Sequence, residues 1–156
     1  HYYGDSHQPC HSITRVDDEY PTGDRGCNSL PLASVDGASN LHAVWDSLIY
    51  IQQQKTGLPM TEQTWETFGN MSAEYQAEYP LAVADYHDND PYEWADENEA
   101  DAQIVYDGVS ENGYLSDEYI AQATEIAKQH VQNGGRRLAN TIKFLWGSKK
   151  ASLFLQ

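Results

Sequence analysis

Apolar residues recur at helical spacing along most of this chain, and no run shows a convincing strand-like alternation of apolar and polar residues. This feature constrains the fold strongly, because an amphipathic helix must bury its apolar face against another element. The clearest example begins at the candidate N-cap Ser116, after which Tyr119 and Ala123 mark one apolar face. We therefore predict an all-α fold.

Cap and breaker residues mark the other expected helices and loops. Asn40 and Thr61 are candidate N-caps, and Pro91 takes a first-turn position among acids. Gly134 and Gly135 are expected to interrupt the last helix. The expected segments are the end of a helix at 1–8 stopped by Pro9, a long loop at 12–39, helices at 40–55, 61–79, within 90–106, at 116–132 and at 136–146, and a tail at 147–156.

The chain is strongly acidic, with a formal net charge of −15 and most of the excess acid in its middle third. An acidic surface repels a nucleic-acid backbone, since affinity there comes mainly from neutralising phosphates. Chemistry on nucleic acid would therefore need a local positive centre, such as a metal cluster. Without such a centre, the acidity is typical of a soluble secreted protein. No stretch approaches the roughly 20 apolar residues that span a membrane, so no membrane span is predicted.

Histidine and aspartate residues recur four positions apart in the first part of the chain. His1 and Asp5 form one such pair. His42 and Asp46 form the second, and His11 lies between the two pairs. On a helix each pair shares one face, and imidazoles and carboxylates are ligands that zinc accepts. A single pair is usually only a surface hydrogen bond, so spacing alone leaves metal binding and surface hydrogen bonding both open.

Four segments resemble, in the same order, motifs of the zinc-dependent class I nucleases, the 3′-nucleotidase family that includes mung bean nuclease. The segments are His1-Tyr-Tyr-Gly-Asp5-Ser-His7-Gln-Pro-Cys-His11, Asp24-Arg-Gly-Cys-Asn28, Asn40-Leu-His42-Ala-Val-Trp-Asp46 and Gly135-Arg-Arg137-Leu-Ala139. The first and third are specific, and the last is weak alone. The resemblance implies a helical zinc-nuclease or phospholipase C-like fold, of which 1–146 would be the carboxy-terminal portion and 147–156 a tail.

The resemblance also implies a set of metal ligands for up to three clustered zinc ions. His1 resembles a ligand of a buried zinc pair, and Asp5 resembles the carboxylate that bridges this pair. His11, His42 and Asp46 resemble the protein ligands of a third, more exposed ion. Clustered cations would neutralise a phosphate, which would explain how an acidic chain acts on an anionic substrate.

The activity implied by the resemblance is that of a zinc-dependent phosphodiesterase. It would cleave single-stranded RNA or DNA to 5′-phosphate products and also act as a 3′-nucleotidase. The family's remaining zinc ligands come from an amino-terminal part, so we expect a complementary amino-terminal segment or chain to complete the buried pair. Two alternatives stay open: a zinc phospholipase C, and a non-enzymatic extracellular structural or interaction protein derived from the nuclease fold.

Two cysteines depart from the family pattern. Cys10 replaces a usual Leu and Cys27 a usual Gly, and both flank the expected metal site. This coincidence predicts a Cys10–Cys27 disulfide, which in the simple loop model would contribute roughly 3 kcal/mol. Two free buried thiols are the alternative. Because Asn70 begins a glycosylation sequon, we further expect a secreted, extracellular or lumenal glycoprotein.

Other residues have simpler expected roles. His7 matches the first motif without being an expected ligand, and we expect it to hold its loop by hydrogen bonds. Trp45 is expected in the core, and His87 and His130 at the surface. The acidic run 85–101 is expected to be a solvated face, because it lacks the glycine and the register of an EF-hand loop. Basic residues near the end are expected to balance helix dipoles and nearby acids.

Overall fold

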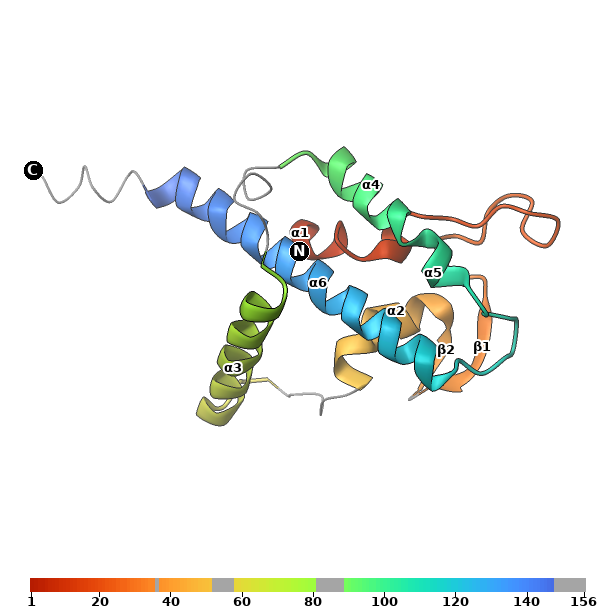
Figure 1. Cartoon of the computed structure of the whole chain (residues 1–156), viewed down its shortest axis with the longest axis horizontal. Coiled ribbons are helices and arrows are strands. Elements are labelled where there is room, and N and C mark those ends of the chain that lie inside the picture. The colour runs from red at the N-terminus through yellow and green to blue at the C-terminus, as the bar shows by residue number, and fades with distance from the viewer. Residues whose placement is uncertain (36, 52–57, 81–88, 148–156) are drawn as a thin grey trace, which may run out of the picture.

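Helices make up most of the regular structure, which confirms the all-α prediction apart from one short hairpin (Figure 1). The computed structural model describes residues 1–35, 37–51, 58–80 and 89–147. The helices are α1 (Tyr2–Asp5), η1 (Pro9–His11, a 3-10 turn), α2 (Leu41–Ile51), α3 (Glu62–Glu78), α4 (Pro91–Ala100), α5 (Ala102–Tyr106), α6 (Asp117–Ile142) and η3 (Lys143–Gly147, a π-helical turn), and the strands are β1 (Pro31–Val35) and β2 (Ala38–Asn40).

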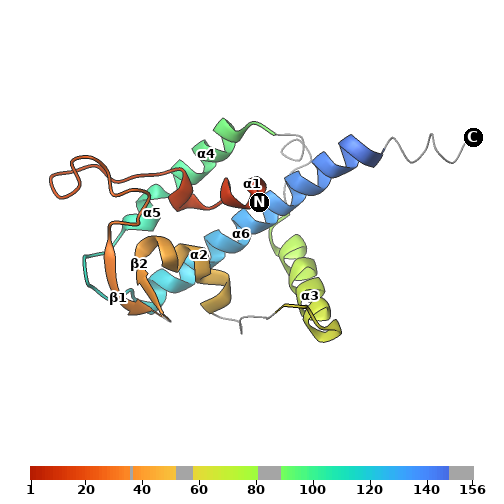
Figure 2. The same ribbon diagram turned by 180° about the vertical axis from the view of Figure 1, so that it is seen from behind.

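The long helix α6 runs across the whole molecule and packs against α1, α2 and α3 (Figures 1 and 2). Its first half meets α2 in the core, where Leu41, Val44 and Leu48 of α2 are fully buried. Trp45 lies in the same core, as predicted, and its ring N–H donates to the Tyr119 hydroxyl at 2.9 Å. Burying these apolar side chains fixes α2, and with it His42 and Asp46, against α6.

Helix α6 is continuous through Gly134 and Gly135, so the predicted break there is wrong. A Cβ atom at Gly134 would lie 3.2 Å from the His7 ring and 3.2 Å from the Tyr3 carbonyl oxygen. The missing side chain therefore lets the amino-terminal segment approach the helix closely, and this packing offsets the low helix propensity of glycine.

A two-stranded antiparallel sheet occupies the end of the segment that was predicted to be loop at 12–39. Strands β1 and β2 pair with Pro31 opposite Asn40. The strands are too short for a period-2 pattern to stand out in the sequence. The hairpin leads directly into α2, where the Leu41 amide donates to the Leu30 carbonyl at 3.1 Å, and the Asn40 side chain caps the Ala43 amide at 2.8 Å as predicted.

Most predicted helix starts are confirmed by their caps. Thr61 accepts a hydrogen bond from the Thr64 amide at 3.2 Å, and Ser116 accepts one from the Tyr119 amide at 3.1 Å. The segment 90–106 forms two helices, α4 and α5, that meet at Asp101.

The helix expected at 1–8 is shorter than predicted, because α1 ends at Asp5 and Pro9 begins the separate turn η1. Part of the expected 40–55 helix, at 52–57, lies outside the described residues, and so does the tail at 148–156. None of the described helices combines the length and apolar character that crossing a membrane requires.

Candidate metal centre

Three predicted ligands converge at one point of the structure. His11 comes from η1, while His42 and Asp46 lie one turn apart on α2. The His11 and His42 Nε2 atoms are 3.2 Å apart. The Asp46 carboxylate lies 3.5 Å from His42 Nε2 and 3.8 Å from His11 Nε2. Each residue offers one ligand atom, and all three atoms lie within 4.8 Å of one another.

The second nitrogen of each imidazole is held by a backbone carbonyl. His42 Nδ1 donates to the Gly26 oxygen at 2.6 Å, and His11 Nδ1 donates to the Asp5 backbone oxygen at 2.8 Å. A carbonyl can only accept a hydrogen bond, so both Nδ1 atoms carry the proton in the neutral rings and both Nε2 atoms present lone pairs. Carbonyl partners of this kind orient the ring of a metal-binding histidine.

Two Nε2 lone pairs facing each other at 3.2 Å cannot form a hydrogen bond with each other. A cation placed between them would satisfy both. Two nitrogens bound at about 2.0–2.1 Å to a tetrahedral zinc ion lie roughly 3.3 Å apart, which is close to the observed separation. The residues present therefore fit a zinc ion by their chemistry and by their spacing.

The Gly26 carbonyl takes its position from an unusual stretch of backbone. Arg25, Gly26 and Cys27 all adopt positive φ angles, of 60°, 61° and 64°. A Cβ atom at Gly26 would overlap the carbonyl oxygen of Cys10. Only glycine therefore lets this loop come close enough to η1 for its carbonyl to reach His42.

Gln8 holds Asp46, the third candidate ligand, in place. Its side-chain N–H donates to Asp46 Oδ1 at 2.9 Å, and its Oε1 accepts from the Cys10 amide at 2.5 Å. This double contact leaves Asp46 Oδ2 turned toward His42. Gln8 lies in the first motif, but the sequence predicts no role for it, because its partner Asp46 comes from a different helix.

His1 and Asp5 form a separate, more open pair beside this centre. His1 Nε2 is 3.2 Å from Asp5 Oδ2, and the two side chains are 84% and 48% exposed. Asp5 Oδ1 lies 3.9 Å from His11 Nδ1, so the pair adjoins the three converging ligands without joining them. Among the described residues, only two ligands are thus gathered at the place where the resemblance implies a zinc pair.

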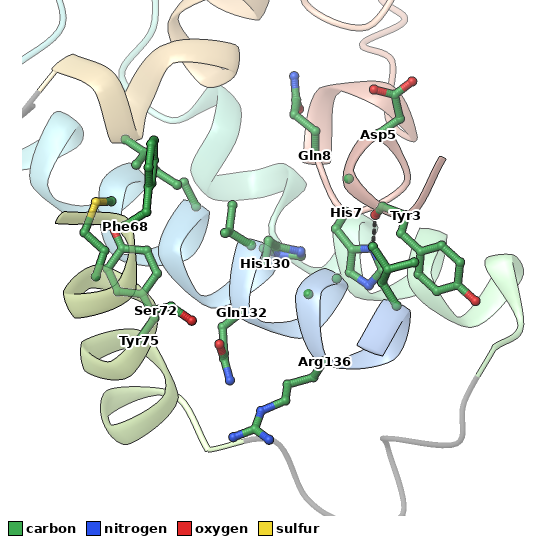
Figure 3. A pocket seen from close by; sticks show the side chains of 18 of the residues that line it. Tyr3, Asp5, His7, Gln8, Phe68, Ser72, Tyr75, His130, Gln132 and Arg136 are labelled. Carbon is green, nitrogen blue, oxygen red and sulfur yellow. Dashed lines mark hydrogen bonds between the residues drawn. The ribbon is translucent and has the colours of Figure 1, made fainter. Parts of the chain in front are cut away.

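A cavity of about 1230 Å³ opens beside these residues and extends between α3 and α6. Its wall includes His1, Asp5, His11 and Asp46. Figure 3 shows Asp5 and Gln8 on one side of this cavity, Phe68, Ser72 and Tyr75 of α3 on another, and His130, Gln132 and Arg136 along α6. Four of the five candidate metal ligands therefore face a space large enough to admit another molecule or another segment of polypeptide.

His7 holds the segment of the first motif in place by hydrogen bonds, as predicted. Its Nδ1 donates to the Tyr3 carbonyl at 2.6 Å (Figure 3), and its Nε2 accepts from Arg137 at 2.7 Å. Burial lowers the pKa of His7 to about 4, and the nearby Arg137 charge acts in the same direction. The ring is therefore neutral at physiological pH, which matches one donating and one accepting nitrogen.

Arg137 links three elements from a fully buried position on α6. Besides His7, it forms two hydrogen bonds to Glu97 of α4, at 2.5 and 2.8 Å, and its guanidinium lies 5.7 Å from the centre of the Trp94 ring. The prediction that basic residues near the end balance nearby acids is correct for this residue. Burial alone would raise the pKa of Glu97, but the bonds to Arg137 outweigh burial and lower it.

Two expectations about surface residues need correction. His130 is buried rather than exposed, and its Nε2 lies 2.8 Å from the Asp101 carboxylate. It is buried because it reaches Asp101, the residue at which α4 and α5 meet. The acidic run is likewise not a uniform solvated face, because Glu97 and Asp101 are paired with residues of α6. His87 lies outside the described residues.

The two cysteines and the sequon have clear positions. Cys10 and Cys27 are both buried as free thiols in the same hydrophobic cluster. Asn70 is exposed on α3. The disulfide and the glycan remain predictions.

The fold and the site together define a class of protein: a helical protein in which two imidazoles and a carboxylate converge as candidate metal ligands. The sequence matches the S1/P1 nuclease family over residues 1–146. The chain belongs to this family, which confirms the resemblance drawn from the four motifs.

Curated relatives from Arabidopsis thaliana carry the name endonuclease. Endonuclease 4 is 27% identical over 157 residues, Endonuclease 2 is 27% identical over 168 residues, and Endonuclease 5 is 24% identical over 165 residues. These alignments cover 96%, 94% and 96% of this chain, but 49%, 50% and 50% of the relatives. The chain therefore spans about half the length of the curated relatives it matches.

Proposed function

We propose that this chain carries part of the zinc centre of an endonuclease, a phosphodiesterase that hydrolyses single-stranded RNA or DNA to 5′-phosphate products and also acts as a 3′-nucleotidase. The observation that carries the proposal is the pair of Nε2 atoms 3.2 Å apart, each on a ring whose Nδ1 is fixed to a carbonyl. Membership of the S1/P1 nuclease family supports phosphoester hydrolysis as the reaction.

The chain's own residues would prepare this centre before any substrate arrives. His11, His42 and Asp46 provide three ligands, which leaves one position of a four-coordinate ion open, as catalytic zinc sites require. When bound, zinc supplies positive charge for the phosphate and acidifies a water molecule. Gly26 and Gln8 hold His42 and Asp46 in place, so little rearrangement is needed on binding.

We further propose that a complementary amino-terminal segment or chain completes the zinc pair at His1 and Asp5. The high exposure of His1 and the separation of this pair from the other three ligands support the proposal. The chain's share of about half of its relatives' length supports it as well.

The cavity between α3 and α6 offers a surface for this amino-terminal segment. Val131 and Leu138 of α6 and Phe68 of α3 line it with apolar groups. Gln132 and Arg136 of α6 add polar groups to the same wall, so the cavity offers both kinds of contact that a polypeptide makes.

A secreted, extracellular or lumenal location is part of the same proposal. The exposed sequon at Asn70 and the acidic surface, with a net charge of −15, support it. Treatment of the protein from its natural source with a glycosidase should lower its mass, and an unchanged mass would argue against this location.

Hydrolysis assays test the reaction. The chain should be assayed with zinc, alone and with a co-expressed amino-terminal segment, on single-stranded DNA, single-stranded RNA and phosphatidylcholine vesicles. Cleavage of nucleic acid only with the segment present is the expected result. Hydrolysis of the lipid alone would favour the phospholipase C alternative, and no hydrolysis of any substrate would favour the non-enzymatic alternative.

Metal binding tests the centre separately from the reaction. We expect Asp46→Asn to weaken zinc binding by at least about tenfold, because the amide lacks the charge of the ligand that it replaces. Asp18→Asn removes an exposed carboxylate outside the site and is the matched control. Equal zinc affinity in both variants, measured by competition with a chelator, would rule out Asp46 as a ligand.

A further inference from the structure

The two cysteines lie next to the two chain segments that hold the imidazoles. Cys10 directly precedes His11, and Cys27 directly follows Gly26, whose carbonyl orients His42. Both thiols are buried, at 2% and 0% exposure, in one hydrophobic cluster, and Gly26, the residue before Cys27, lies so close to Cys10 that a Cβ atom on it would overlap the Cys10 carbonyl oxygen. The Cys27 carbonyl also accepts the backbone N–H of His42.

The backbone at Cys27 is strained. Its φ of 64° lies in the left-handed region, where glycine is favoured and a Cβ atom is strained. Arg25 in the same loop has a φ of 60°, so the loop as a whole carries this strain. The Cys27 Sγ–H donates to the Tyr106 hydroxyl at 3.3 Å, but a thiol is only a weak donor, whereas a covalent bond to Cys10 would hold the residue firmly.

We propose that Cys10 and Cys27 form a disulfide that clamps the loop bearing Gly26 onto the turn bearing His11, and that this clamp raises the affinity of His11, His42 and Asp46 for zinc. The second half of this inference rests on the proposed zinc centre, and the first half does not. The bond would fix His11 through its chain neighbour Cys10, and His42 through the carbonyl of Gly26, the chain neighbour of Cys27. It would also limit the unfolded ensemble through loop closure.

Oxidation must precede complete folding, because the buried thiols are closed to an external reagent in the final structure. In the open chain, the thiolate of one cysteine attacks an external disulfide such as oxidised glutathione, and one glutathione thiolate leaves. The thiolate of the second cysteine then attacks the mixed disulfide and expels the second glutathione. The protein loses two electrons and two protons, and the glutathione disulfide is reduced to two thiols.

The folded site can accommodate this bond without leaving a buried polar group unsatisfied. Loss of the Cys27 S–H removes one weak hydrogen bond to Tyr106. The Tyr106 hydroxyl keeps its own donated bond, at 2.8 Å, to the Asp24 carboxylate. Asp24 in turn accepts from the Arg15 amide at 3.1 Å, so the loop retains its internal contacts.

Thiol counting tests the disulfide by itself. The 156-residue chain is refolded with a mixture of oxidised and reduced glutathione and then denatured without reductant in the presence of a thiol reagent. No reactive thiol is the expected result, and two should appear after reduction. Two reactive thiols before reduction would overturn the disulfide and the clamp together.

Chelator competition tests the clamp. Zinc affinity is compared between chains refolded under oxidising and under reducing conditions, and we expect about a tenfold loss on reduction, a change typical of disturbed outer-shell support. The Cys27→Gly variant, which suits the local φ, should bind zinc with an affinity that does not respond to reductant. Circular dichroism verifies that each sample is folded.

The outcomes separate the two halves of the inference. Equal zinc affinity in the two redox states of the native chain would overturn the clamp. A chain that forms the disulfide and binds no zinc in either state would overturn the proposed zinc centre, and the clamp with it, but would leave the disulfide established.

Discussion

Gly26 connects backbone conformation to the chemistry of the candidate centre. Its φ of 61° and its close approach to the Cys10 carbonyl exclude any side chain, and its own carbonyl fixes the tautomer of His42. A substitution at this position should therefore affect stability and zinc binding together.

We predict that Gly26→Ala destabilises the chain by about 2 kcal/mol or more, through positive-φ strain of roughly 1 kcal/mol and the overlap with Cys10. Gly37→Ala is the matched control, because Gly37 also has a positive φ, of 88°, but its Cβ would meet no atom. The Gly37→Ala variant should lose only the stability that the positive-φ strain costs. Denaturant unfolding measures both, and equal losses would show that the close approach to Cys10 contributes nothing.

The sequence predicted which side chains converge, but not what holds them. His42 and Asp46 share a helical face because they are four residues apart, so their proximity follows from local geometry. The carbonyls that orient His42 and His11 belong to Gly26 and Asp5, which reach the rings only in the folded chain. Carbonyl oxygens carry no sequence signature, since every residue has one.

Two neighbouring glycines of helix α6 differ in what surrounds them. Gly134 faces His7 and Tyr3 at 3.2 Å, whereas a Cβ at Gly135 would meet no atom outside its own helix. His7 has little room to give way, because Tyr3 and Arg137 hold both of its ring nitrogens.

We predict opposite effects for two adjacent substitutions on α6. Gly135→Ala should stabilise the chain by up to about 1 kcal/mol through helix propensity alone. Gly134→Ala should destabilise it, because pushing His7 away outweighs the same gain. Thermal unfolding of the two variants provides the comparison, and stabilisation by both would mean that the α1–α6 contact is loose.

The link between α4 and α6 should depend on pH through Glu97. Its pKa is lowered in the folded chain relative to the ordinary 4.5, so the stability from its ionised form is present above 4.5 and is lost as the pH falls below it. The Glu97→Gln variant has no carboxyl group at this position, so its stability does not include this contribution at any pH. The stability difference between the two proteins should therefore shrink on acidification, measured by denaturant unfolding with a chelator present.

Asp96→Asn serves as the control for this pH effect, because Asp96 is exposed in the middle of the same helix. Its stability should run parallel to that of the wild type across the acid range. A wild-type to Glu97→Gln difference that stays constant from pH 7 to about 3 would contradict the lowered pKa.

The sequence was sufficient to predict where helices begin, but not which other elements their residues contact. Thr61 and Ser116 act within three residues, so their capping bonds could be predicted. The continuity of α6 could not, because the reason for Gly134 lies in a segment at the other end of the chain. The burial of His130 was missed for the same reason, since Asp101 comes from another element.

At the scale of the whole molecule, α3 and α2 differ in how they are attached. Helix α2 packs on α6, both strands and η1, whereas the main packing of α3 among the described elements is on α6. Only Tyr75 of α3 is buried, and the Tyr79 hydroxyl donates to Glu125 of α6. The rest of its inner face lines the cavity.

We predict that backbone amides of α3 exchange with deuterium faster than those of α2 in the isolated chain, since few buried contacts oppose local opening. Addition of the amino-terminal segment should slow exchange in α3 and in the second half of α6. Hydrogen exchange followed by mass spectrometry resolves the two helices. Equal protection of α2 and α3 in the isolated chain would contradict the prediction, and unchanged rates with the segment would argue against docking in the cavity.

The hydrogen bond from His42 to Gly26 also gives the centre a spectroscopic reporter. At 2.6 Å, on a side chain that is only 17% exposed, the Nδ1 proton is shielded from exchange with water. Such a proton should give its own resonance in a proton NMR spectrum, downfield of the backbone amides. Titration with zinc should move this signal without broadening it away, because the metal would occupy the opposite nitrogen of the same ring.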